Sequence, residues 1–154
     1  MERVLLDRGI FRVGDCNAFS LPRRYAGKDL LVGLVVSGRA YVYVKRAVAF
    51  GSGSYVGVPA VLDNGGLKGQ RVKVFVEYFK KKDVVQSICR AVGVLSSVAD
   101  AVFVVWDGAL DRDVVLALFR RGYLLVSIEI KSRQGSGTYY IYEFVKKDVA
   151  LADG

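Results

Sequence analysis

Hydrophobic and polar residues alternate along much of the first half of the chain. Alternation over residues 3–13 and 41–50 predicts strands, because successive side chains of a strand point to opposite faces of a sheet. Each stretch ends at a glycine, Gly14 or Gly51, and a further short strand pattern follows each glycine. The pattern therefore predicts a β-hairpin in each place.

The two hairpins belong to an internal repeat. The chain has two prolines, Pro22 and Pro59, which lie 37 residues apart, and each follows its turn glycine by eight residues. After the proline each copy continues to a glycine and a further apolar strand, at residues 30–36 and 72–76. Proline fits directly after a strand because it lacks the ladder N–H. So small a unit buries little apolar surface alone, so the copies are predicted to share one core.

The second copy carries the clearer motif. It reads Ser54-Tyr-Val-Gly-Val-Pro59, then has room for one short helical turn that Asn64-Gly65-Gly66 would end, and continues as Leu67-Lys-Gly69 before Val72. This sequence resembles the SpoVT/AbrB-like swapped-hairpin DNA-binding domains, although one fewer residue separates Leu67 from Gly69. The first copy keeps only Leu21-Pro22 and Gly27 of that pattern. The resemblance covers residues 2–78 and implies a β-barrel of two interlocked swapped-hairpin repeats.

In that family, basic residues on the hairpin arms and loops contact DNA. The resemblance therefore implies contacts to phosphates or base edges for the cations at matching positions, which are Arg8, Arg12, Arg23, Arg24, Lys28, Lys45 and Arg46. The distribution of charge also places a polyanion-binding site in the first half of the chain. The chain holds 23 Lys and Arg against 15 Asp and Glu, a formal charge of +8, and 13 of the cations but six of the acids lie within residues 1–80. Such an excess favours a polyanionic partner.

The second half of the chain changes to a helical period. Apolar residues at spacings of three to four predict helices over residues 83–95 and 110–121, and the apolar run 101–106 predicts a strand covered on both faces. Residues 123–131 and 138–146 predict an antiparallel strand pair. The order is αβαββ. Strands 101–106 and 123–131, joined through a helix, are predicted to be parallel neighbours in a small mixed sheet.

These patterns predict an α+β protein of two parts. Residues 1–79 form the basic, β-rich, tandem swapped-hairpin DNA-binding domain, and residues 80–154 form a small α/β domain for association or regulation. The leading functional prediction is a DNA-binding protein of the AbrB-like type, a transcription regulator with duplex DNA as its partner. Association through residues 80–154 into a homo-oligomer would place several DNA-contacting arms along one duplex.

One set of residues points to an enzyme instead. Glu129 and Lys131 alternate onto one face of a strand, and Asp107 ends the strand 101–106. This set weakly resembles a degenerate PD-(D/E)xK nuclease core, which implies carboxylates that hold Mg²⁺ beside a lysine that steadies the attacking water. A helix intervenes between Asp107 and Glu129, which departs from that pattern. A Mg²⁺-dependent nuclease and a non-enzymatic interaction module, whose charge serves solubility alone, are therefore the alternatives to DNA binding.

The residue types exclude several other classes. The chain has no histidine, which excludes Ser-His-Asp and Cys-His catalytic sets and His-ligated metals. Cys16 and Cys89 are too few for a Cys-only zinc site, and whether they pair stays open. The leading interpretation thus requires no catalytic residue, metal or cofactor. Asp107-Gly108, directly after an apolar strand, marks either a ligand crevice or a helix cap.

The same composition bears on location. No run of about 18 uncharged apolar residues occurs, and the first residues lack the apolar core of a signal peptide. We therefore expect a cytoplasmic protein without a membrane partner. High Val, Tyr, Lys and Arg content with a single Met hints at a thermophilic source.

Overall fold

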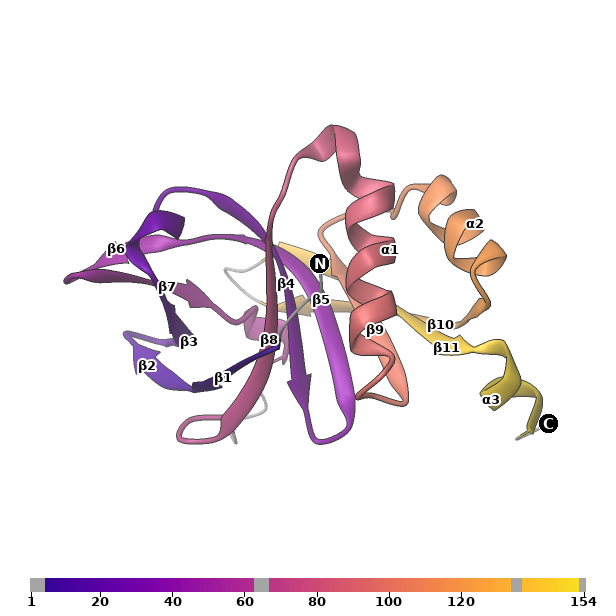
Figure 1. Ribbon diagram of the computed structural model, residues 1–154, viewed down its shortest axis with the longest axis horizontal. Helices are drawn as coiled ribbons and strands as arrows, with labels where there is room; N and C mark the ends of the chain where they lie inside the picture. The colour runs from indigo at the N-terminus through magenta and orange to yellow at the C-terminus, as the bar shows by residue number, and fades with distance from the viewer. Residues whose placement is uncertain (1–4, 63–66, 134–136, 153–154) are drawn as a thin grey trace.

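The computed structural model describes residues 5–62, 67–133 and 137–152 (Figure 1). Its helices are α1 (Val84–Leu95), α2 (Arg112–Arg120) and α3 (Lys147–Ala152), with 3-10 turns η1 (Arg23–Tyr25), η2 (Ala60–Leu62) and η3 (Lys81–Asp83). Its strands are β1 (Leu6–Gly9), β2 (Phe11–Val13), β3 (Cys16–Leu21), β4 (Asp29–Val36), β5 (Arg39–Arg46), β6 (Val48–Phe50), β7 (Gly53–Gly57), β8 (Arg71–Tyr78), β9 (Ala101–Trp106), β10 (Tyr123–Arg133) and β11 (Gly137–Lys146). The predicted α+β class is confirmed.

The strands of the described residues form two open sheets. The larger has the order β1-β8-β4-β5-β9-β11-β10 and the smaller the order β2-β3-β7-β6. The pair β5 and β9 is parallel, and the other neighbours are antiparallel. The chain passes from the larger sheet to the smaller one at Ile10, between β1 and β2, and again at Ala47, between β5 and β6. Both residues are buried, so each bend is anchored in the core.

The sheets replace the β-barrel that the sequence predicts, and no closed barrel forms within the described residues. The edge of β5 that faces away from β4 is paired with β9, so the first-half strands continue into a larger open sheet. The physical reason lies in β9, where Val102, Val104 and Val105 are buried. A strand that is apolar on both faces takes an interior place in a sheet.

The two sequence copies occupy equivalent places in the fold. Hairpin β2–β3 leads through η1 to β4, and hairpin β6–β7 leads through η2 to β8. Strand β3 pairs with β7 and β4 with β8, both antiparallel. The Gly69 N–H donates to the Ile10 carbonyl at 2.9 Å, and the Gly27 N–H donates to the Ala47 carbonyl at 2.8 Å. The segment β1-β8-β4-β5 therefore has the same order read from either end, as an approximate two-fold relation requires.

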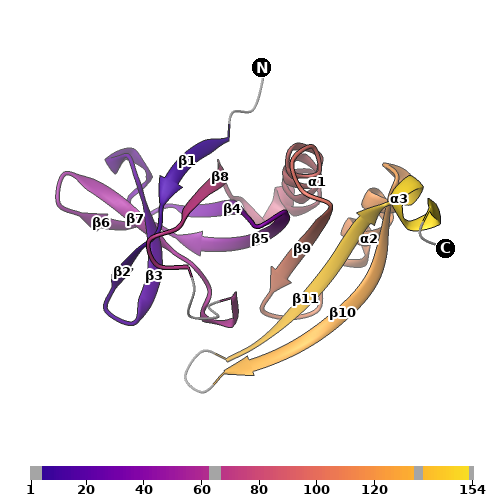
Figure 2. The ribbon, with the colours of Figure 1, turned by 90° about the horizontal axis from the view of Figure 1, so that it is seen from below.

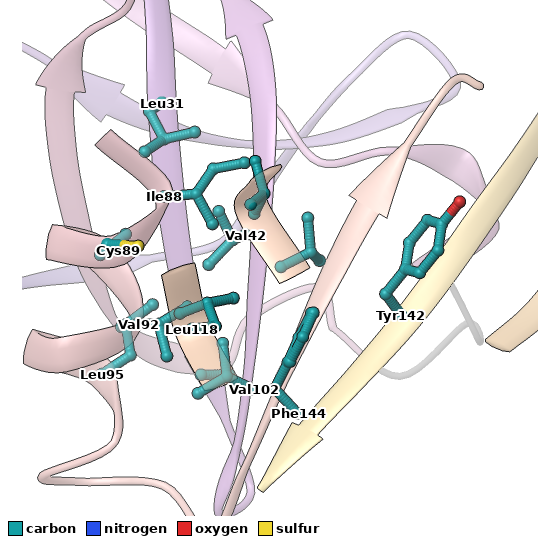
Figure 3. Close-up of a cluster of buried hydrophobic side chains, with 14 of the residues drawn as sticks. Leu31, Val42, Ile88, Cys89, Val92, Leu95, Val102, Leu118, Tyr142 and Phe144 are labelled. Carbon is teal, nitrogen blue, oxygen red and sulfur yellow. The ribbon is translucent and has the colours of Figure 1, made fainter. Parts of the chain in front are cut away.

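The larger sheet lies between two hydrophobic clusters. On one face, Ile88 and Leu95 of α1 and Leu118 of α2 pack against Val42 and Phe144 of the sheet (Figure 3). The other face packs against the smaller sheet, in a cluster that joins Phe19, Val32 and Val56 to Val105 and Ile141. Both clusters contain residues from both halves of the chain. Figure 1 shows the smaller sheet toward one end of the molecule and α2 and α3 toward the other.

Most elements of the second half agree with their predictions. Helices α1 and α2, strand β9 and the antiparallel hairpin β10–β11 lie where the periodicity places them. The predicted neighbourhood of strands 101–106 and 123–131 is wrong, because β11 lies between β9 and β10. Ile141, Tyr142 and Phe144 of β11 are buried, and this more apolar strand takes the interior place. The predicted cap at residues 64–66 falls outside the described residues, and the domain boundary at 79/80 stays a prediction.

Candidate nucleic-acid interface

Four of the seven predicted DNA-contacting cations gather around η1. Arg23 and Arg24 are the first two residues of this turn, which follows the extended backbone of Pro22. The carbonyl of Lys28 accepts a hydrogen bond of 3.0 Å from the N–H of Ala47, which brings Lys28 beside the end of β5. Arg46 is the last residue of that strand. We call Arg23, Arg24, Lys28 and Arg46 the η1 corner.

The guanidinium groups of the η1 corner are held in place. Arg23 donates from Nη1 to the Gly51 carbonyl, in the turn between β6 and β7. Arg24 donates to the Tyr25 hydroxyl at 3.3 Å and lies 4.9 Å from the centroid of the same ring. Arg46 makes two hydrogen bonds to the Asp29 carboxylate, at 2.9 and 3.3 Å, which lower the pKa of Asp29 and raise the pKa of Arg46.

Arg23, Arg24 and Lys28 make no ion pair within the described part of the chain. Their cationic groups therefore have no carboxylate to neutralise them in the structure described. Only Arg46 shares its charge with an acid, and both partners of that pair are about half exposed or more, with side-chain exposures of 68% and 46%. The corner thus presents a net positive surface to solvent.

The equivalent corner of the other repeat lacks these charges. By the two-fold relation, Ala60 and Val61 stand in the places of Arg23 and Arg24, Gln70 in the place of Lys28, and Gly9 in the place of Arg46. All four residues are uncharged. Because η2 forms with uncharged residues at these four places, the fold does not require cations there. Two cations nevertheless lie near η2, because Arg71 pairs with Gly9 and Lys68 precedes Gly69. The η1 corner therefore differs from the corner at η2 in the number of its cations.

The other three predicted cations lie elsewhere. Arg8 on β1 donates from Nε to the Ser20 carbonyl at 2.9 Å. Lys45 on β5 holds the equivalent place, with its Cε at 3.4 Å from the position that a Cβ on Gly57 would occupy. Arg12 is exposed on β2. The structure therefore assembles one compact group of four from the seven residues and distributes the rest along the first-half strands.

The sequence did not predict that aromatic side chains lie beside these cations. Tyr25 packs against Tyr78 with ring centroids 5.4 Å apart, and Tyr78 is 49% exposed. Phe50, at the hairpin tip that Arg23 contacts, is 57% exposed and stacks on Phe11 at 6.4 Å. Exposed rings near cations offer surfaces for bases or sugars. The sequence pattern that could have indicated these rings is an aromatic residue next to a basic run or a turn, as in Arg24-Tyr25 and Phe50-Gly51.

A pocket opens where the parallel strands β5 and β9 separate. Their pairing ends at Val42 and Val104, although both strands continue. The space beyond is a pocket of about 610 Å³. The residues that line it include the aromatic side chains Tyr43, Phe79, Trp106 and Tyr139 and the charged side chains Lys45, Lys81, Asp107 and Asp111. The carboxyl ends of parallel strands are a common place for ligands.

One side chain of this pocket has an unsatisfied polar group. Tyr43 is 2% exposed, and its hydroxyl has no hydrogen-bond partner within the described residues. Burial raises the pKa of Tyr43 well above its usual range, so the hydroxyl stays protonated at every ordinary pH. Leaving a buried hydroxyl unpaired costs free energy. Tyr43 therefore lines the pocket with its ring and carries a buried hydrogen-bond donor that has no acceptor within the described residues.

The three residues of the nuclease alternative are not brought together. Glu129 and Lys131 lie on β10 and form an exposed ion pair at 3.8 Å. Asp107 follows β9, and β11 separates that strand from β10, which puts the two backbones about 10 Å apart. Across the part of the chain that the structure describes, no three acidic or cysteine residues are grouped so that they could hold a metal ion. Asp107 belongs to the pocket instead.

The two cysteines do not pair with each other. Cys16 is exposed and Cys89 is buried, and both are free thiols. Burial raises the pKa of the Cys89 thiol, which makes it unreactive. Among the described residues, no helix has the length and apolar character to cross a membrane.

No protein-family model, curated protein or solved structure matches this chain. The geometry of the η1 corner and of the pocket therefore carries the functional argument.

Proposed function

We propose that the protein binds nucleic acid, with duplex DNA as the expected partner, through the η1 corner. The observation that carries the proposal is the difference between the two equivalent corners of the repeat. Four cations stand around η1, and Ala60, Val61, Gln70 and Gly9 stand around η2. A basic surface that served solubility alone would have no reason to place more cations around one of two equivalent turns than around the other.

The chemistry of the corner suits a phosphate backbone. Arg23 and Arg24 are adjacent and have no carboxylate partner, so phosphate oxygens can bind both guanidinium groups without competition from an acidic side chain. Tyr25 holds the guanidinium of Arg24 against its ring, which reduces the side-chain entropy that binding would cost. Two related hairpin units are one part of what the swapped-hairpin resemblance implies, although the β-barrel that it also implies does not form. A transcription regulator is the context we propose on that resemblance.

The test is the salt dependence of binding to a labelled duplex, measured by fluorescence anisotropy between about 50 and 200 mM salt. The double variant Arg23→Ala, Arg24→Ala should bind more weakly, and the slope of log Kd against log salt should fall by about 2, since each lost phosphate contact removes about 0.9. The matched control is Arg112→Ala, Arg120→Ala, which removes the same charge from exposed positions of α2 at the other end of the molecule (Figure 1).

The outcomes separate the alternatives. An equal loss in both double variants would mean that binding follows net charge and not the η1 corner. Absence of salt-dependent binding to duplex DNA and to RNA would leave the interaction module. Strand cleavage on addition of Mg²⁺, abolished by Glu129→Ala, would restore the nuclease, which the separation of Asp107 from Glu129 argues against.

The side chains that line the pocket between β5 and β9 favour a second, additional function. We infer that the pocket between β5 and β9 binds a small planar molecule that carries an anionic group. Aromatic side chains line it, and Lys45 and Lys81 make no ion pair within the described residues. Asp111 already caps α2 by accepting the Asp113 N–H at 2.9 Å, so it competes little for those lysines.

The chain's single tryptophan, Trp106, lines the pocket and reports on its occupant. Titration with AMP or with 4-hydroxybenzoate should change the emission of Trp106. Lys81→Gln should weaken the response, and Lys82→Gln, next in the chain but not part of the pocket, should not. An unchanged emission with both compounds would remove this function, and equal effects of the two lysine variants would place the compound outside the pocket.

A further inference from the structure

Strand β10 is an exposed edge of the larger sheet. It ends the order β1-β8-β4-β5-β9-β11-β10, so its outer backbone groups have no neighbouring strand. Figure 2 shows β10 on the outside of a long ribbon with β11 that extends past the body of the molecule. Its 11 residues contain no proline, and residues from Val126 to Ser132 are exposed. Natural edges are usually short, charged or interrupted, because an open edge pairs with other strands.

The outer part of β10 is also apolar. Val126, Ile128 and Ile130 are 48%, 55% and 61% exposed. Ile128 and Ile130 pair with Tyr142 and Tyr140 and so lie on one face of the sheet, whereas Glu129 and Lys131 lie on the other. Helix α2 packs on the sheet with Tyr123 and Leu125, at the start of the strand, and leaves the isoleucines uncovered. An exposed apolar strand at a free edge marks an interaction surface.

We propose that β10 pairs antiparallel with β10 of a second copy of this chain, about a two-fold axis at Ile130, so that two seven-stranded sheets join into one. A two-fold axis closes the assembly at a dimer, because each copy offers its β10 edge to the other and no β10 edge remains unpaired. The pairing would satisfy the outer backbone groups of residues 127–133. It would also bring the two Ile130 side chains together. This proposal does not depend on nucleic-acid binding.

Charge fixes the register. With Ile130 at the axis, Glu129 lies opposite Lys131 of the partner subunit, and the same pair forms a second time across the axis. A shift that puts Glu129 at the axis would place that carboxylate opposite its own copy, which repels. A shift to Ile128 would carry the pairing across the irregularity between Leu125 and Ser127. The Ile130 register avoids both faults.

Seven residue pairs make a small interface, so the dimer should be weak and concentration-dependent. Sedimentation velocity of the full chain over a range of concentrations should show a monomer that converts to a dimer. Glu129→Lys should abolish the dimer, since it places like charges opposite each other twice. The double variant Glu129→Lys, Lys131→Glu should restore it, because the exchange recreates both opposite-charge pairs. Glu129 and Lys131 are both exposed, so circular dichroism should show unchanged folding.

A cysteine cross-link tests the register separately. In a Cys16→Ser background, Ile130→Cys should oxidise to a covalent dimer, because directly opposite Cα atoms of an antiparallel pair lie about 4.5–5.5 Å apart. Ile128→Cys is the matched control, and its two copies would lie about 14 Å apart along the strands, too far for a disulfide. A chain that stays monomeric at all concentrations would overturn the proposal. Failure of the charge exchange to restore the dimer, or faster cross-linking at residue 128, would overturn the register.

Discussion

Two buried tyrosines of the larger sheet differ in one hydrogen bond. The Tyr142 hydroxyl accepts the Leu110 N–H at 3.0 Å, which ties the loop before α2 to β11. The Tyr43 hydroxyl has no partner within the described residues. Both side chains are less than one-tenth exposed, at 7% and 2%. The same substitution should therefore have opposite effects on the free energy of unfolding at the two positions.

We predict that Tyr43→Phe stabilises the free protein by about 1 kcal/mol, because it removes a buried polar group that lacks a partner. Tyr142→Phe should destabilise it by about 1–3 kcal/mol, because the Leu110 N–H is left buried without an acceptor. Urea unfolding of the two variants at neutral pH measures both values. A loss of stability in Tyr43→Phe would show that its hydroxyl has a hydrogen-bond partner in solution, and the argument for an unpaired buried donor at Tyr43 would then fail.

A second residue-scale feature is the close approach of α1 to the sheet at Gly33. A Cβ at this position would lie 2.6 Å from Cδ1 of Leu95, closer than real contacts allow. Glycine is therefore required on β4 by packing and not by backbone conformation, because β4 is a regular strand here. The sequence alone does not reveal this, since it shows only a glycine within an apolar strand.

Gly33→Ala should destabilise the protein by about 1–3 kcal/mol through this clash. Leu95→Ala alone should cost about 2–5 kcal/mol, because it leaves a cavity in the core. The double variant should cost clearly less than the sum of the two, since the added methyl group enters the space that Leu95 vacates. Additive losses in chemical unfolding would mean that α1 moves away from β4 without resistance.

At the scale of elements, local sequence patterns predicted most of the helices and strands. They did not predict which strands pair across long distances in the chain. The spacing of Val84, Ile88 and Leu95 was enough to predict α1, and the apolar run of β9 was enough to predict a buried strand. Pairing of β5 with β9 joins residues that are about 60 positions apart, and no short-range pattern encodes it. Because β9 pairs with β5, the sheet stays open and the pocket forms beside these strands. Neither the open sheet nor the pocket could therefore be predicted from the sequence.

The candidate site divides in the same way. Arg23 and Arg24 stand out in the sequence because they follow Pro22 directly. Lys28 and Arg46 lie near them because the Ala47 N–H donates a backbone hydrogen bond to the Lys28 carbonyl. The equivalent hydrogen bond in the other repeat, from Ile10 to Gln70, shows that this contact belongs to the repeated fold. Neither hydrogen bond is encoded in a short-range sequence pattern. The pocket required Tyr43 of one half and Trp106 of the other to meet.

The exchange of charge between the two corners gives a prediction at this scale. Ala60→Arg, Gln70→Lys should create a second cationic corner at η2, because these positions are equivalent to Arg23 and Lys28 and neither packs in the core clusters. We expect affinity for duplex DNA to rise and the slope of log Kd against log salt to become steeper by about 2. Placed in the Arg23→Ala, Arg24→Ala background, the same pair should restore part of the lost affinity. Unchanged binding would mean that the η1 corner acts through more than its charge.

At the scale of the whole molecule, the charge asymmetry and the hydrophobic core divide the chain differently. The cations are concentrated in the first half, yet the core crosses the predicted boundary at 79/80. Leu31, Val42 and Phe75 from the first half share one cluster with Ile88 and Val92 of α1. The edge of β5 is likewise covered by β9. Removal of the second half would expose both the apolar residues that α1 covers and the edge of β5.

We therefore predict that the full chain unfolds in one cooperative transition and that residues 1–79 alone do not reach a stable fold. The isolated fragment would expose the apolar face that α1 covers and the open edge of β5, a combination that favours aggregation. Calorimetry and circular dichroism of both chains check this, with the fragment carrying Leu31→Lys and Val42→Thr as a control for simple loss of solubility. A fragment that melts cooperatively and binds duplex DNA would establish residues 1–79 as an independent domain, and the second half would then be an addition to a complete DNA-binding unit.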